Sequence, residues 1–167
     1  MTAHDRVPFD VESYTRYVHE GAATGRCFIC EIAQGLRDNH LLVFRDEIVI
    51  AFLARAPTLF GYCLVAPVEH RTNVLGDFTE DEYLAMQQRV HRVGRALTRA
   101  VPTERLYVLS LGSHQGNAHV HWHLAPLPPE VPYEQQQYAA LMHENGYLHI
   151  PDAEQRTLAE RIRREIG

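Results

Sequence analysis

The sequence predicts an α+β fold with a mainly antiparallel sheet, and three features of the chain carry that prediction. Short apolar runs of strand length follow one another closely, one long helix interrupts them, and helices form the tail. Strands joined by short turns pair antiparallel, and one crossover helix can cover a face of their sheet. The chain has 167 residues, which fits one domain, and 46% of them are hydrophobic, which is enough for a core.

The elements before the long helix are one short helix and three strands. Asp10 stands where it can cap a helix that Gly25 would end. The apolar runs 41–45 and 48–53 flank a charged turn, so we expect a hairpin, although Asp-Glu is not a favoured tight-turn pair. A third strand is predicted over 62–66, just before a proline.

The long helix is predicted over about 79–100, because its start, its face and its end all carry signals. Thr79 and Glu82 form a capping box, and Pro102 stops the helix. Apolar residues recur every three or four positions in between, which gives one stripe that can pack on a sheet. The stripe consists of Met86, Val90, Val93, Leu97 and Val101.

After the long helix we expect two strands, over 106–111 and 118–125, separated by a polar loop. A short helix is predicted near 134–144, and a terminal helix begins at Asp152 with Gln155 as its capping partner. Both helices belong to a tail that we treat as part of the same domain.

Composition excludes several classes of function. The formal charge is −5 and the positive residues are scattered, so the chain lacks the basic stripe of a protein that binds DNA or RNA as a polymer. No run of about 18 apolar residues exists to span a bilayer, and the N-terminus lacks the plan of a secretory signal. Three cysteines do not make a disulfide framework. We therefore expect a cytoplasmic protein with no membrane partner.

The most informative segment holds three histidines at alternate positions, His119, His121 and His123. In a strand they line one face at steps of about 6.6 Å, while the apolar residues between them turn toward the core. Either the imidazoles bind a catalytic metal, or at least one acts as a nucleophile or an acid–base group. A spacing of about 6.6 Å between successive histidines is too long for all three to bind one metal ion without a bend in the strand. A solvated strand face is the remaining alternative.

A second group of residues has the chemistry of a metal site. Cys27 and Cys30 form a C-x-x-C motif, which alone is a weak signal, since it also suits redox chemistry or buried thiols. The hairpin predicted after it argues against a thioredoxin-like role. A closed zinc site needs two more ligands, and His70 and His119 stand beside predicted strands that can supply them. Such a Cys₂His₂ zinc would be structural, because no coordination position stays open.

The chain resembles the histidine triad (HIT) superfamily, in its zinc-containing branch. The signature of three histidines with apolar spacers is matched at every position over 119–125. The segment around the C-x-x-C motif resembles the entry segment of that branch. Residues 44–52 resemble the first hairpin of the family, and 61–74 resemble its third strand and the loop with a zinc histidine.

This resemblance implies a fold and an assembly. The family has a five-stranded antiparallel sheet with the long helix packed on it, and its members usually pair as homodimers about a two-fold axis. We therefore expect a single HIT-like domain over 1–167, flanked by N-terminal and C-terminal helices. Its core would span about 26–127, and a helical extension would span about 128–167.

The resemblance also implies a reaction on a small-molecule nucleotide. It is hydrolysis or transfer at the α-phosphate of a nucleoside phosphoramidate or a dinucleoside polyphosphate, through a covalent nucleotidyl-histidine. Carried over by position, His121 is the nucleophile, and His123 contacts the phosphate and assists proton transfer. The first histidine of the triad completes the zinc site. The nucleobase would lie in an apolar cleft formed by Phe28, Ile29 and Phe52.

Two departures from the family pattern concern the substrate. Many members carry an acidic residue that binds the ribose hydroxyls, and here that position is Ala54, followed by Arg55. Many also have Gly-Gln-Ser before the triad, where this chain has Gln115 and Asn117, the latter a substitute donor to phosphate. The missing carboxylate supports an alternative hypothesis, a catalytically weak nucleotide-binding protein that retains the fold.

Overall fold

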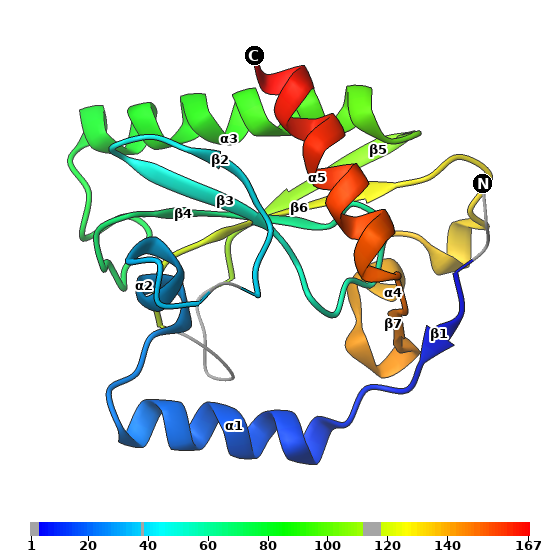
Figure 1. Ribbon diagram of the computed structural model, residues 1–167, viewed down its shortest axis with the longest axis horizontal. Helices are drawn as coiled ribbons and strands as arrows, with labels where there is room; N and C mark the ends of the chain where they lie inside the picture. Colours follow the sequence, from blue (N-terminus) through cyan, green and yellow to red (C-terminus); the bar gives the residue numbers. More distant parts are fainter. Residues whose placement is uncertain (1–3, 38, 112–117) are drawn as a thin grey trace.

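A computed structural model describes residues 4–37, 39–111 and 118–167, and a five-stranded antiparallel sheet forms its centre (Figure 1). The strand order is β2-β3-β4-β6-β5, and every neighbouring pair is antiparallel. The predicted fold class and the five-stranded sheet are therefore confirmed. The strands are β2 (Leu42–Arg45), β3 (Val49–Leu53), β4 (Cys63–Pro67), β5 (Arg105–Leu109) and β6 (Trp122–Leu127).

Two helices cover one face of the sheet. Helix α3 (Glu80–Ala100) lies along this face, and α5 (Asp152–Ile166) packs against α3 and the edge strand β2 (Figure 1). The predicted stripe of α3 joins the largest buried cluster together with Trp122 and Leu124 of β6. Burial of these apolar side chains removes them from water, which is the main force that holds the helices on the sheet.

The predicted hairpin and the predicted capping box of α3 are both confirmed. The carboxylate of Asp46 accepts hydrogen bonds from the backbone N–H of Ile48, at 2.9 Å, and of Val49, at 2.8 Å. These bonds explain why an Asp-Glu pair can turn this hairpin. At the start of α3, the side chain of Thr79 accepts from the Glu82 N–H, and the Glu82 carboxylate accepts from the Thr79 N–H.

The opposite face of the sheet carries the short helix α2 (Phe28–Ala33) and a second apolar cluster. Cys27 caps this helix, because its sulfur accepts the N–H of Cys30 at 3.3 Å. The apolar side chains of α2 pack on those of β3 and β4 in this cluster. The cluster consists of Cys27, Ile29, Ile32, Ala33, Ile50, Phe52, Leu64 and Ala66.

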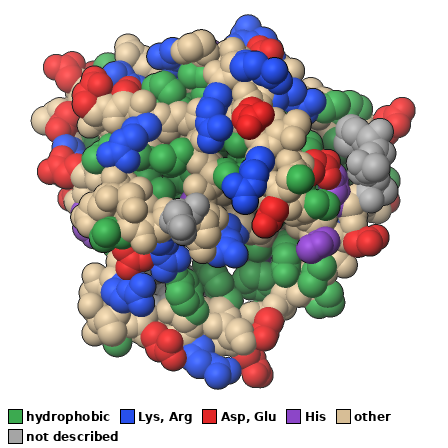
Figure 2. Space-filling view, viewed as in Figure 1, with side chains coloured by type: hydrophobic (Ala, Val, Ile, Leu, Met, Phe, Trp, Pro, Cys, Tyr) green, Lys and Arg blue, Asp and Glu red, His purple; other side chains and the backbone are tan. Residues whose placement is uncertain are grey.

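The N-terminal segment crosses below this second face without lying flat on it. Helix α1 (Val11–Ala23) begins after Asp10, whose carboxylate accepts the N–H of Ser13, as the capping prediction requires. A short strand β1 (Arg6–Val7) pairs with β7 (Tyr147–Leu148), a contact that local sequence patterns do not predict. Figure 1 shows α1 set apart from the sheet, and Figure 2 shows the molecule hollowed between α1 and the rest.

Three details of the C-terminal half correct the predictions. Strand β6 begins at Trp122 rather than at 118, because the Val120 N–H bonds to the Arg71 carbonyl in the loop after β4. The predicted helix over 134–144 is broken into three turns, because Gln137 has a positive φ of 52°. These turns are η1 (Tyr133–Gln135), α4 (Tyr138–Leu141) and η2 (His143–Asn145).

The terminal helix α5 begins at Asp152, as predicted, but its predicted cap is wrong. The residue before the first turn of α5 is Pro151, and Asp152 is already inside the helix. The side chain of Gln155 donates to the carbonyl of Ile150 and does not act in a capping box. Among the described residues, no helix has the length and the apolar character needed to cross a membrane.

Candidate functional site

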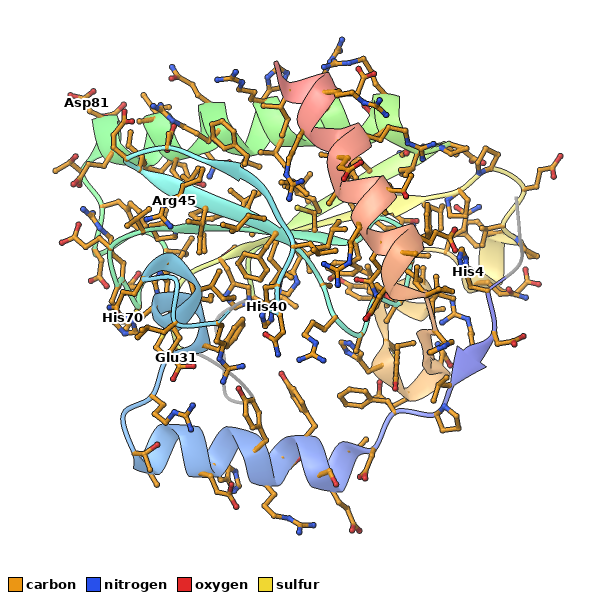
Figure 3. The ribbon with its side chains drawn as sticks, in the orientation of Figure 1. His4, Glu31, His40, Arg45, His70 and Asp81 are labelled. Atoms are coloured by element: carbon orange, nitrogen blue, oxygen red, sulfur yellow. The ribbon has the colours of Figure 1, made fainter. Side chains whose placement is uncertain are left out.

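Four side chains from three segments converge at one end of the second sheet face. Cys27 and Cys30 come from the start of α2, His70 from the loop after β4, and His119 from the segment before β6. Their ligand atoms all lie within 4.8 Å of one another. The Nδ1 atom of His119 is 3.4 Å from both sulfurs, and Nδ1 of His70 is 3.3 Å from the Cys30 sulfur. In Figure 3, His70 lies beside α2.

This group fits a tetrahedral metal ion. Zinc bonds of about 2.3 Å to sulfur and 2.0–2.1 Å to nitrogen place sulfur and nitrogen ligands about 3.6 Å apart. The observed separations of 3.3 and 3.4 Å are close to that value. The Nε2–H of His119 donates to the Pro67 carbonyl at 2.9 Å, so its Nδ1 lone pair faces the sulfurs. The predicted ligand set is thus brought together and could hold a metal.

The thiols of this group interact strongly. Burial and the neighbouring Cys27 raise the pKa of Cys30 to about 11. A bound cation would reverse this effect and release protons as it binds, because the metal ligand is the thiolate.

His121 presents one free ring nitrogen to the second face. Its Nδ1–H donates to the backbone carbonyl of His119 at 2.7 Å, so Nε2 carries the lone pair. The hydroxyl of Ser110 donates to the His121 carbonyl at 2.9 Å and fixes the backbone at this point. Burial lowers the pKa of His121 below its ordinary value, so its ring is neutral at neutral pH.

His123 lies beside His121, with ring centroids 4.7 Å apart. Its Nδ1 is 3.1 Å from the hydroxyl of Tyr62, whose pKa burial raises to about 12. Burial, and to a smaller extent the repulsion that a second proton would meet beside His121 and His143, lowers the pKa of His123 to about 3. Both partners are therefore neutral, and the phenol donates to Nδ1, which leaves Nε2–H of His123 as a donor.

The three histidines of the triad do not converge on one ion. Both ring nitrogens of His119 are already engaged, one by the cysteine sulfurs and one by a carbonyl. His121 and His123 line a cavity, whereas His119 does not. This arrangement separates a metal group from a histidine pair, and it gives no support to the alternative of one catalytic ion on all three.

Aromatic rings form a wall of the same cavity. Phe28 and His40 stack with centroids 6.1 Å apart, and each meets Phe52 edge-on. Ile29 is fully buried in the core and is not a cavity residue, because consecutive helical side chains point about 100° apart. We therefore leave Ile29 out of the candidate site, contrary to the expectation from the sequence.

His40 and His143 also lie at the cavity, although no motif in the sequence singles them out. Figure 3 shows His40 between the sheet and α1. Burial, followed by the charges of Arg55 and Arg37, lowers the pKa of His40 to about 4. His143 packs on Phe9, at 4.6 Å between centroids. No spacing pattern marks these residues, because the contacts that bring them here are long-range.

The cavity occupies the hollow between the sheet and α1 and has a volume of about 1300 Å³. Its walls include the histidine pair, the aromatic wall and residues of α1 such as Tyr14 and Tyr17. Ligand sites usually have volumes of about 300–1,000 Å³, so this space can take more than a mononucleotide. The predicted contacts Gln115 and Asn117 lie outside the described residues.

Comparisons with known proteins agree with this geometry. The family model of the HIT domain matches residues 37–129. The chain is 32% identical over 110 residues to adenosine 5'-monophosphoramidase of Schizosaccharomyces pombe, which covers 62% of this chain and 76% of that protein. The chain therefore belongs to the HIT family, the class that its sheet and its histidine triad define.

Solved structures show the same fold. A histidine triad nucleotide-binding protein of Sulfolobus tokodaii superimposes with a TM-score of 0.69 at 24% identity, over 84% of this chain and 91% of that one. A zinc-bound histidine triad family protein of Mycobacterium smegmatis gives 0.65 at 19% identity, over 84% and 92% of the two chains.

Proposed function

We propose that this protein is a nucleotide hydrolase or transferase that acts at the α-phosphate of nucleotide conjugates. The observation that carries the proposal is the orientation of His121, whose Nε2 lone pair faces the cavity while Nδ1–H is held by a carbonyl. A neutral imidazole with a fixed tautomer is a good nucleophile toward phosphorus near neutral pH. Membership of the HIT family and the similarity to a phosphoramidase support the same reaction class.

The reaction follows from the positions of the two rings. Nε2 of His121 attacks the α-phosphorus, the bond to the leaving group breaks with its electron pair, and the leaving group takes up a proton. The Nε2–H of His123 donates to a non-bridging oxygen, where negative charge develops. Water, or another acceptor, then attacks the phosphorus and breaks the P–N bond. The nucleotide is released, and His121 returns to its neutral form.

The base would lie against Phe28 and Phe52, with His40 beside them. These rings form an apolar wall within the cavity that also contains the histidine pair. Stacking on such a wall is tolerant of the base, since every base has a π-face. Gln115 and Asn117 remain proposed phosphate contacts, on the strength of the family resemblance alone.

We propose zinc as the ion of the four-residue group, in a structural role. Four protein ligands leave no position for substrate, so zinc here would tie α2 and the segment before β6 to the sheet. The chemistry at phosphorus would stay with the histidine pair. Zinc thiolates and free thiols persist in a reducing compartment, which is why we propose the cytoplasm.

The decisive experiment combines turnover with capture of the intermediate. His121→Ala should lose at least a thousandfold in kcat/KM on adenosine 5'-phosphoramidate, because no other group can form the covalent bond. Wild-type protein quenched with acid during turnover should carry a nucleotidyl adduct at His121 by mass spectrometry. His91→Ala, on an exposed part of α3, is the matched control. Near-normal turnover by the His121 variant would refute the mechanism.

A second function has one observation in its favour. Ala54 stands where many family members bind the ribose hydroxyls with a carboxylate, which suits a protein that binds nucleotides with little turnover. This alternative predicts that AMP or a nucleotide conjugate raises the melting temperature while no product forms during prolonged incubation. Product formation at a rate that His121→Ala removes would exclude it.

We propose that two copies pair at the edge strand β5. The other edge, β2, is covered by α5, and Arg163 of α5 donates to the carbonyl of Leu42. Strand β5 pairs only with β6 among the described residues, and the exposed side chains of Val108 and Leu111 lie at this edge. Sedimentation should give a dimer, and Val108→Asp should convert it to a monomer. A monomeric wild-type protein would contradict this assembly.

A further inference from the structure

The end of β3 has an unusual pair of residues beside the histidine pair. The Ala54 N–H donates to the carbonyl of Tyr62 at 2.9 Å, and the hydroxyl of Tyr62 holds His123. Ala54 is thus linked through Tyr62 to His123, the proposed phosphate contact. Its side chain is a single methyl group, and the next residue, Arg55, lines the cavity.

Of the three arginines that line the cavity, two form ion pairs and one does not, among the described residues. Glu31 is the partner of two cavity arginines, since its carboxylate oxygens accept from Arg26, at 3.0 Å, and from Arg37. Arg37 also donates to the hydroxyl of Tyr17 on α1. Among the described residues, Arg55 has no hydrogen bond or ion pair, although it lines the same cavity and is exposed to it. One guanidinium therefore remains available for an anion of a ligand.

Arg55 is also close to the aromatic wall. Burial lowers the pKa of His40, and the nearby positive charge of Arg55 lowers it further. The ring of His40 packs on Phe28 and Phe52. A nucleoside with its base on that wall and its α-phosphate at the histidine pair has its ribose between them, near positions 54 and 55. The methyl of Ala54 leaves room there, and the cavity of about 1300 Å³ is larger than most ligand sites.

We propose that the site prefers nucleotide conjugates whose ribose carries a phosphate on its 2'- or 3'-hydroxyl, and that Arg55 binds this phosphate. The inference rests on the proposed function and specifies its substrate class. A carboxylate at position 54 would repel such a group, whereas a guanidinium binds phosphate through two parallel hydrogen bonds. Ala54, which has no carboxylate, and Arg55, which has no partner among the described residues, would then both favour the same substrate.

Binding of unreactive nucleotides tests the preference without requiring turnover. Calorimetry compares AMP with adenosine 3',5'-bisphosphate and adenosine 2',5'-bisphosphate on the metal-loaded protein. We expect one bisphosphate to bind at least about tenfold tighter than AMP, the effect of one charge-assisted contact, with an advantage that shrinks as salt rises. The position isomer that gains more identifies the hydroxyl that carries the phosphate.

Two substitutions assign the effect to Arg55. Arg55→Ala should bring the ratio of bisphosphate to AMP affinity to about one, and Arg55→Glu should invert it, because a like charge repels the second phosphate. Arg95→Ala, which removes an exposed arginine of α3 outside the cavity, should keep the wild-type ratio. Equal affinities for AMP and both bisphosphates, or a preference that survives Arg55→Ala, would overturn the inference.

Turnover of unmodified adenosine 5'-phosphoramidate separates this inference from the proposed function. If the protein hydrolyses that compound through His121 yet shows no preference for a ribose phosphate, only the substrate class is wrong. If it neither binds nor hydrolyses any of these nucleotides, the proposed function fails with it.

Discussion

A backbone carbonyl selects the reactive nitrogen of His121. The Nδ1–H of this ring is held by the carbonyl of His119, whose own side chain belongs to the metal group. Because the two residues are two positions apart, the metal group and the nucleophile share one short stretch of backbone. Under the proposed function, the three histidines would have different roles: His119 binds the metal, His121 reacts with the substrate, and His123 contacts the phosphate.

Tyr62 fixes the third ring, so its hydroxyl should matter for catalysis. Tyr62→Phe should lower kcat by about tenfold with little change in KM, because His123 loses the partner that sets its tautomer and orientation. The measurement is steady-state kinetics on adenosine 5'-phosphoramidate. Tyr107→Phe is the control, since its hydroxyl accepts the Gln137 N–H outside the cavity. An equal loss of kcat in both variants would contradict a specific role for Tyr62.

His40 should make the folded protein sensitive to mild acid. Its pKa is about 4 when folded, against 6.5 for an ordinary histidine, so the unfolded chain binds the extra proton first. Stability from this residue is therefore complete above about pH 6.5 and falls as pH drops toward 4. His40→Gln should reduce the difference in urea midpoint between pH 7.5 and pH 5, while His91→Gln should not. An unchanged difference in the His40 variant would refute this account.

At the scale of elements, we expect the capping box of α3 to contribute to the stability of the protein. Arg71, then the Thr79 backbone and side chain, lower the pKa of Glu82 to about 2, so the box is charged and closed at neutral pH. Thr79→Ala should cost about 1 kcal/mol of unfolding free energy. Chemical denaturation measures it, and Thr98→Ala, whose hydroxyl bonds within α3, is the control. A loss no larger than that of the control would show that the cap contributes little.

Elements that depend on neighbouring residues could be predicted from the sequence. The hairpin, α3 and the start of α1 have their capping or turn residues within three or four positions of the bonds they make. The start of β6 could not be predicted, because it depends on the hydrogen bond from the Val120 N–H to the carbonyl of Arg71, which is distant in the sequence. Gln137 broke a predicted helix by a backbone conformation that no periodicity reveals.

The candidate site divides in the same way. The four residues of the metal group could be predicted, because the C-x-x-C motif together with His70 and His119 supplies the four ligands of a closed zinc site, although the motif alone is a weak signal. His40 and Arg55 were not, since each reaches the cavity through the fold and belongs to no motif. The sequence could not show that Ile29 points into the core and not into the cavity, because the direction of each helical side chain depends on how the helix packs.

At the scale of the whole molecule, the metal group should control stability more than chemistry. Removal of the metal with a chelator should lower the melting temperature by on the order of 10 °C, since it releases α2 and the segment before β6 together. Cys30→Ser should have a similar effect. Calorimetry and metal analysis, with one zinc expected per chain, provide the measurement. Lost turnover without any thermal shift would instead indicate a catalytic ion.

The two ends of the α1 segment are fastened to the body. At one end β1 pairs with β7, and Arg6 donates to the carbonyls of Gly146 and Thr58; at the other, Cys27 joins the metal group. The backbone between these two points runs through α1 to the start of α2 (Figure 1). Its residues Phe9, Tyr14 and Tyr17 line the cavity. Under the proposed function, we expect a small nucleotide conjugate to fit beneath this segment and a nucleotide in the middle of a polymer to be excluded. The path of the backbone would then limit the size of the substrate.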